Sequence, residues 1–199
     1  MNYLAHLHIA HRAGSNLLGN LLGDFVRGNP DEAYGQAIAN GIRLHRRVDM
    51  FTDTHATSKQ LKQLFPESLK RYAPIALDMF WDHCLARQWS DFHAESLDDF
   101  VRQCSDKIKH QQQDTALPDG YLRLVDKLWA QQWLQSYREF DNTCYALERI
   151  AQRRPKLAPL AECNHCLAEH YPLLTAHFSA FYQLVMEDAL TFNRSLEKN

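Results

Sequence analysis

The chain has 199 residues, of which 45% are hydrophobic and 23% charged, and its net charge at pH 7 is −2. This composition is typical of a soluble globular protein, and the length suits one domain spanning residues 1–199. Apolar runs fall short of the roughly 20 residues that cross a bilayer, which excludes an integral membrane protein. The N-terminal segment lacks the basic stretch and apolar core of a signal peptide, so we expect a cytoplasmic protein. The net charge argues against nucleic acid as a partner.

The first third of the chain shows helical spacing of its apolar residues. A first helix is expected around residues 4–11, and a second is expected to begin at a Ser15 cap and reach about Phe25. The run Gly28-Asn29-Pro30 should end it, and a third helix should extend from Asp31 to about Phe51. A short helix is expected over residues 55–65.

The remaining segments are also helical in pattern. Pro74 suits a first turn before a helix over 75–88, and Ser96 with Asp99 forms a capping box for a helix to about residue 110. Residues 111–120 predict a loop, and one helical pattern then continues to about residue 152. Pro155 and Pro159 mark a connector, and Pro172 should split or kink the last helical stretch, which ends near Ser195. No segment alternates like a strand, so the predicted fold is an all-α helical bundle.

Five cysteines are scattered along the chain, a pattern that favours reduced thiols over a disulfide framework. Cys163 and Cys166 form a CxxC around His165. A zinc site would need two more close ligands, and there is no second CxxC, so we expect structural cysteines.

Histidines and acidic residues gather in a few segments. His45, Asp49 and Asp53 follow one another four apart on a helical face, and Asp78 and Asp82 repeat that spacing beside His83. Three further histidines and one aspartate complete the set: His6, His8, His11 and Asp24. Carboxylates and imidazoles from different helices can hold a divalent ion, which acidifies a bound water and neutralises phosphate oxygens.

Nearby arginines, Arg27, Arg43, Arg46 and Arg47, can add phosphate contacts. These residues together suggest metal-assisted hydrolysis of a phosphoester. Each pattern alone is more often structural: a His–Asp pair at helical spacing is commonly a surface pair, and a single His on an apolar face, such as His8, is commonly a core residue. Spacing alone does not bring the segments together.

Five blocks, taken in order, closely resemble the acyl carrier protein phosphodiesterases. They are "MNYLAHLHIAH", "GNLLGDFVRGNP", "GIRLHRRVDMFTD", "APIALDMFWDHCLARQW" and "LWAQQWLQSY". The resemblance implies hydrolysis of the phosphodiester between 4′-phosphopantetheine and a serine of acyl carrier protein, with manganese as the usual metal and Mg²⁺, Fe²⁺ or another divalent ion as alternatives. It also implies a divergent relation to the all-helical HD-type phosphohydrolases, although this chain has Asp82-His83 where those enzymes have His-Asp.

Carried over by position, the resemblance makes Asp24, His45 and Asp78 the leading metal ligands. Asp82 follows as a further ligand, and His83 as a group that orients a ligand or donates a proton to the leaving serine. His6 and Asp49 are ligands or orient one. Arg27 and Arg46 are the candidates for holding the phosphate.

The implied partner is a small acidic protein, so a local basic surface is expected. Its candidates are Arg43, Arg47, Arg153, Arg154 and Lys156, with plain solvated charge as the alternative. Four tryptophans, Trp81, Trp89, Trp129 and Trp133, are candidates for an apolar groove, although such aromatics are more often core. The competing functions are an HD-like hydrolase of nucleotides or small phosphodiesters and a non-enzymatic helical module that binds an acidic protein. The oligomeric state is not predicted.

Overall fold

The candidate residues are carried by helices that meet around one central helix near the N-terminus. The structure is a computed structural model, and it describes residues 1–196. These residues contain no strand, which confirms the all-α prediction. The helices are α1 Tyr3–Arg12, α2 Leu17–Leu22, α3 Gln36–Thr54, α4 Ala56–Leu61, α5 Ala73–Arg87, α6 Leu97–Gln111, α7 Asp119–Ala130, α8 Trp133–Ser136, α9 Phe140–Ala151, α10 Cys163–Glu169 and α11 Tyr171–Leu196. Short 3₁₀ helices lie at Pro30–Glu32 (η1), Lys62–Leu64 (η2), Trp89–Asp91 (η3) and Pro155–Glu162 (η4).

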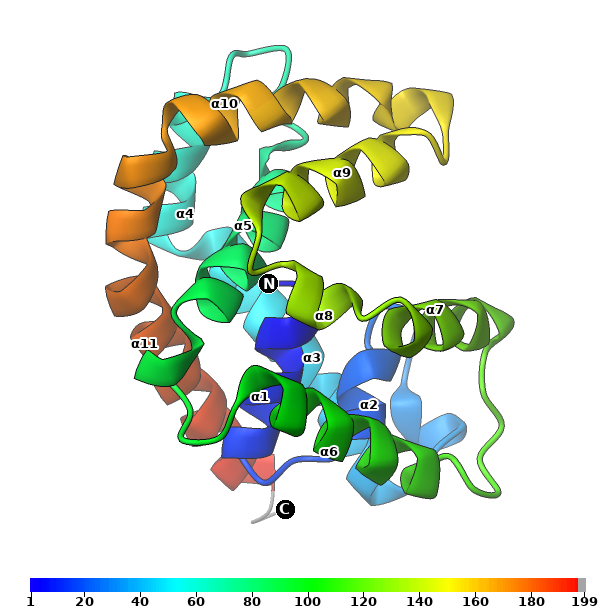
Figure 1. Ribbon diagram of the computed structural model, residues 1–199. Helices are drawn as coiled ribbons and strands as arrows, with labels where there is room; N and C mark the ends of the chain where they lie inside the picture. The colour runs from blue at the N-terminus through cyan, green and yellow to red at the C-terminus, as the bar shows by residue number, and fades with distance from the viewer. Residues whose placement is uncertain (197–199) are drawn as a thin grey trace.

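Helix α1 lies in the interior and contacts α2, α3, α5 and α11 (Figure 1). All of its residues from Leu4 to Ala10 are buried, including His6 and His8. A helix that is apolar all round is stable only when other elements cover every side. Because α1 is covered in this way, its polar side chains must find partners inside the protein.

Helices α2 and α3 approach each other at two glycines. A Cβ atom on Gly19 would lie 2.2 Å from the carbonyl oxygen of Ile38, and one on Gly41 would lie 2.6 Å from that of Asn16. Since the clashing atoms belong to the backbone, no side-chain rotation relieves them. This close approach places the beginning of α2 directly against the first turns of α3.

Two predicted boundaries near this contact are wrong. Asn16, not Ser15, caps α2, because its side-chain oxygen accepts a hydrogen bond from the Gly19 amide at 2.7 Å. Helix α2 also ends at Leu22, so Asp24 lies in the following turn. The third helix begins at Gln36 rather than Asp31, because η1 forms first and Gly35 then serves as the N-cap of α3.

The second half also departs from the predicted boundaries. The long helix expected up to residue 152 is three helices, and Gln132 interrupts it with a left-handed backbone conformation, φ 50°. The expected connector at Pro155 is the 3₁₀ helix η4. Pro172 is the second residue of α11, where a missing N–H costs no hydrogen bond, so it starts this helix rather than splitting it.

Other predictions are confirmed. Ser96 caps α6, with its hydroxyl 3.1 Å from the Asp99 amide, and the five cysteines are free. Trp81 and Trp89 are buried core residues, although Trp89 also borders a surface hollow beside His93, and Trp129 and Trp133 are half-buried against the same core. Within residues 1–196, no helix is both long and apolar enough to cross a membrane.

Candidate functional site

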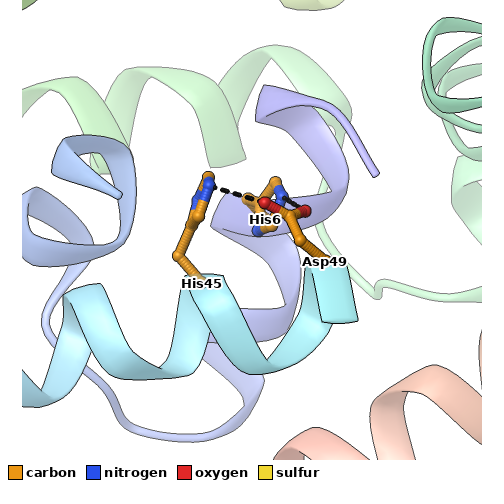
Figure 2. A group of neighbouring side chains, drawn as sticks. All are labelled: His6, His45 and Asp49. Carbon is orange, nitrogen blue, oxygen red and sulfur yellow. Dashed lines mark hydrogen bonds and ion pairs between the residues drawn. The ribbon is translucent and has the colours of Figure 1, made fainter. Parts of the chain in front are cut away.

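Two helices bring His6, His45 and Asp49 together. The Nε2 atom of His6 lies 3.0 Å from Oδ1 of Asp49, and Nε2 of His45 lies 3.0 Å from the other oxygen, Oδ2 (Figure 2). His45 and Asp49 are one helical turn apart on α3, as their spacing predicted, while His6 comes from α1. Within residues 1–196, the imidazole Nδ1 atoms of His6 and His45 have no hydrogen-bond partner, so the Nε2 atoms carry the polar contacts of both rings.

Asp24 reaches His45 from the turn after α2. Its Oδ1 lies 3.4 Å from Nε2 of His45. The approach depends on Gly23, because a Cβ atom there would lie 2.2 Å from the His45 ring and 2.7 Å from its Cβ. The absence of a side chain at Gly23 therefore allows the His45 ring to pack against the turn that contains Asp24.

The site is buried on its imidazole side and open on its carboxylate side. The side chains of His6 and His45 are 1% and 3% exposed, whereas those of Asp49 and Asp24 are 38% and 50% exposed. Solvent, or a substrate, therefore meets the carboxylate oxygens first.

The charges of the cluster are strongly coupled. Burial alone would lower the pKa of His45, but its hydrogen bonds to Asp24 and Asp49 outweigh that effect and raise the pKa to about 9. Burial lowers the pKa of His6 to about 4, and the neighbouring His45 adds to the decrease. Although burial opposes it, the histidines hold the pKa of both Asp24 and Asp49 below the usual value. At neutral pH one imidazolium therefore lies between two carboxylates.

The geometry fits a divalent cation. Two ligand atoms that bind one ion at about 2.1 Å and at right angles lie about 3 Å apart. The contacts of 3.0, 3.0 and 3.4 Å around His6, His45, Asp49 and Asp24 approach this spacing. In the described part of the chain, His6, His45 and Asp49 are the group whose ligand atoms all lie within 4.8 Å of one another. Mixed nitrogen and oxygen donors suit manganese, iron or zinc. Among the residues that the structure describes, the Cys163–Cys166 pair forms no such group.

Asp78 lies near His6, His45 and Asp49 but forms an ion pair with the α-amino group of Met1. Its Oδ1 is 2.7 Å from the α-amino nitrogen of Met1, and the same nitrogen is 3.8 Å from Oδ1 of Asp49. Burial raises the pKa of Asp78, although the ammonium opposes this. Asp78 therefore joins the cluster through the amine rather than by direct contact with the histidines.

Asp82 is fully buried and holds the start of α1. Its two oxygens accept hydrogen bonds from the amides of Leu4 at 2.8 Å and Ala5 at 3.0 Å. These amides belong to the first turn of α1 and have no partner within that helix. Burial raises the pKa of Asp82 to about 7 in spite of the two hydrogen bonds. Asp82 thus fixes the start of the helix that carries His6.

His83 points away from this group. Its Nδ1 lies 2.7 Å from the carbonyl oxygen of Tyr137, and its Nε2 lies 2.7 Å from the hydroxyl of Tyr171. Because a carbonyl only accepts, Nδ1 carries the proton and Nε2 accepts from Tyr171. Burial lowers the pKa of His83, so it is neutral and has no proton to donate from Nε2. The structure does not bring His83 to the cluster.

The predicted phosphate-binding and docking arginines are divided between internal and free roles. Arg46 donates to the carbonyl oxygens of Val26 and Gly28 at 2.7 and 2.8 Å and so holds the loop after Asp24. Arg43 pairs with Asp31, and Arg47 pairs with Asp188. The others are exposed and form no ion pair within residues 1–196: Arg27, Arg153, Arg154 and Lys156.

Comparison with known proteins identifies the family. The model of the family described as acyl carrier protein phosphodiesterase matches residues 1–185. The chain belongs to this family. An acyl carrier protein phosphodiesterase from Enterobacter sp. (strain 638) is 43% identical over 193 residues, covering 95% of this chain and 97% of that protein.

Two Escherichia coli acyl carrier protein phosphodiesterases show similar agreement. The protein from strain O45:K1 is 42% identical over 192 residues, and that from strain O139:H28 is 40% identical over 193 residues. Each alignment covers 95% of this chain and 97% of the relative. No solved structure matches the chain, so the divergent HD-like relation stays a prediction. Membership of the acyl carrier protein phosphodiesterase family places the chain among phosphodiester hydrolases.

The residues that meet in this family member have a different order of importance from the one the sequence predicted. His6 and Asp49, which ranked behind Asp78, are in direct contact with His45. Two contributors were missed. Gly23 makes room for His45, and Tyr3 lies against Asp24, whose charge adds to the burial that raises the pKa of the Tyr3 hydroxyl. Gly23 immediately precedes Asp24, and this adjacency was the available signal.

Proposed function

We propose that the chain hydrolyses holo-acyl carrier protein to apo-acyl carrier protein and 4′-phosphopantetheine, using a divalent ion, with manganese as the first candidate. The single observation that carries this proposal is the convergence of His6, His45 and Asp49, with Asp24 beside them, in a member of this family. When bound, the ion supplies an acidified water and stabilises negative charge on phosphate oxygens.

The residues of the chain have distinct tasks in this proposal. His6, His45 and Asp49 hold the ion, and Asp24 closes the set from the solvent side. The imidazole rings are buried, so water is excluded from their nitrogen atoms. The carboxylates are exposed, so a phosphate group can approach the ion from their side. Arg27 is exposed within three residues of Asp24 and is available to contact a phosphate oxygen, whereas Arg46 is committed to the loop.

The test follows the intact mass of holo-acyl carrier protein incubated with the purified chain and manganese. We expect loss of the phosphopantetheine mass, and no loss with a chelator or with Asp49→Asn. Removal of a ligand should reduce bound metal and lower the rate at least about 100-fold, the upper range for outer-shell changes. Asp106→Asn is the matched control, because Asp106 is an exposed aspartate on α6 whose partner, Lys109, lies 3.7 Å away.

Three results would contradict the proposal. One is an unchanged carrier mass with folded, metal-loaded wild-type protein. The second is hydrolysis of nucleotides or small phosphodiesters without hydrolysis of the carrier, which would favour the HD-like alternative. The third is full activity of Asp49→Asn with unchanged metal content, which would remove the cluster from the reaction.

A further inference from the structure

A basic hollow lies on the surface next to the candidate site. Its volume is about 470 Å³, and it is lined by Lys59, Lys62, Gln63, Glu67, Lys70 and Arg71. These residues come from α4, from η2 and from the segment that leads into α5. We use the term basic hollow for these six residues.

The positive charges of the basic hollow are largely uncompensated. Glu67 is the one carboxylate in the lining, and it pairs with Lys70 at 2.7 Å. Lys59 and Lys62 form no ion pair within the described residues, and the Arg71 guanidinium lies over the Tyr72 ring, 4.6 Å from its centre. Three unpaired cations thus gather on a chain whose net charge is −2. Such a concentration attracts an anionic partner.

The basic hollow borders the candidate site. Helix α4 directly follows α3, which carries His45 and Asp49, and α5, which carries Asp78, begins just after Arg71. Asp53 lies one turn beyond Asp49 and joins the two regions. Burial raises the pKa of Asp53, and the charges of the Met1 amine and Lys62 oppose that rise. Lys62 is therefore close enough for its charge to act on Asp53, on which the charge of Asp49 also acts.

The basic surface continues to η4. The Tyr72 hydroxyl donates to the carbonyl oxygen of Lys156 at 2.7 Å, which holds the exposed Lys156 next to Arg71. Two residues earlier, Arg154 is exposed, and the charge of Arg153 acts on Tyr3, which lies against Asp24. Cations therefore flank the site on the Asp53 side and on the Asp24 side. Arg43 and Arg47 are not in the lining of the basic hollow, and both are paired with carboxylates.

We propose that the basic hollow and Lys156 dock the acidic face of the protein substrate, next to the site that cleaves it. This inference rests on the proposed function and names the surface that binds the carrier. The lysines of the basic hollow are separate, flexible and spread over three elements. Such an arrangement matches the spaced carboxylates of a protein surface better than it matches a single small anion. Single-stranded nucleic acid is held by exposed aromatic rings, and the lining has none.

The test compares Lys59→Glu/Lys62→Glu with Lys107→Glu/Lys109→Glu. Both double variants change the charge by the same amount. The second pair lies on α6, at the opposite end of the molecule from α4 (Figure 1). The lysines of the basic hollow are outside the proposed metal cluster, so metal content and hydrolysis of bis(4-nitrophenyl) phosphate should be unchanged in both variants.

We expect the KM for holo-acyl carrier protein to rise about tenfold at low salt in the hollow variant, with little change in kcat, and to stay near the wild-type value in the α6 variant. The difference should shrink as added salt screens the charges. A KM for the hollow variant within twofold of the wild-type value would overturn the docking surface while leaving the hydrolase intact.

Binding of apo-acyl carrier protein, which has no bond to cleave, separates this proposal from the reaction. Weaker binding of apo-carrier by the hollow variant alone would support docking even if the wild-type chain hydrolysed nothing. Docking would be overturned if the wild-type chain failed to bind the carrier, or if both double variants bound it equally well. It would also be overturned if the hollow variant lost affinity for a single-stranded oligonucleotide but kept its affinity for the carrier.

Discussion

The imidazole rings of His6 and His45 stack face to face, with their centroids 3.9 Å apart and 15° between their planes. Both rings direct Nε2 toward the carboxylate of Asp49. Burial lowers the pKa of His6, and the like charge of the stacked His45 ring adds to the decrease, whereas hydrogen bonds to Asp24 and Asp49 raise the pKa of His45. The two rings therefore form one unit with Asp49 rather than two independent core histidines.

Replacing Gly23 with alanine should damage the site without touching a ligand. The new methyl group would overlap the His45 ring and its Cβ, so His45 must move away from Asp24. We expect manganese affinity to fall about 10- to 100-fold, as for lost outer-shell support, and the free energy of unfolding to fall by about 1–3 kcal/mol. Isothermal titration with manganese and urea denaturation measure the two effects.

The control for this change is Gly35→Ala. A Cβ atom at Gly35 meets no atom within 4 Å, and the residue has an ordinary negative φ of −62°. Unchanged manganese affinity in Gly23→Ala would show that the position of His45 does not matter for the ion.

Asp82→Asn should act through stability. An amide group has one acceptor oxygen, so one of the Leu4 and Ala5 amides would face an N–H₂ group in place of an oxygen. Leaving such a buried donor unpaired costs about 1–3 kcal/mol. We expect a lower Tm and a smaller loss of rate, because α1 and therefore His6 are held less firmly.

Asp98→Asn provides the comparison, since Asp98 lies on the surface with Arg138 at 3.2 Å. The opposite outcome for Asp82→Asn is also informative. An unchanged Tm together with complete loss of bound metal would make Asp82 a ligand, as the sequence resemblance implied.

His8 should make the protein acid-sensitive. It is fully buried against the Tyr182 hydroxyl at 2.7 Å, and burial lowers its pKa to about 3. Between about pH 6.5 and 3, the unfolded chain binds a proton at this residue that the folded chain does not. The free energy of unfolding should therefore fall as pH falls through this window, by up to about 1.4 kcal/mol per pH unit from this residue.

Chemical denaturation at stepped pH values, with a chelator present, measures this slope. His8→Leu should flatten this slope by up to one proton. A His8→Leu slope equal to that of the wild type would mean that His8 titrates normally in the folded state.

Much of the fold could be predicted from local patterns. Helix content, the Ser96 cap of α6 and the His45–Asp49 pairing depend on residues three or four apart, which lie on one helical face whatever the rest of the chain does. Errors in the boundaries arose where two local preferences compete. Asn and Ser are both good N-cap residues, so the sequence does not distinguish Asn16 from Ser15. The left-handed conformation at Gln132 was not predicted because the residue is not a glycine.

The sequence by itself determined an all-helical chain and named every residue of the cluster, because these properties are carried by local periodicity and by family blocks. Only the tertiary structure decided which candidates meet. Asp78 pairs with the Met1 amine, Asp82 with the first turn of α1, and His83 with Tyr137 and Tyr171. A buried polar group takes the partner that packing brings within about 3 Å, and that distance depends on helices far apart in the chain.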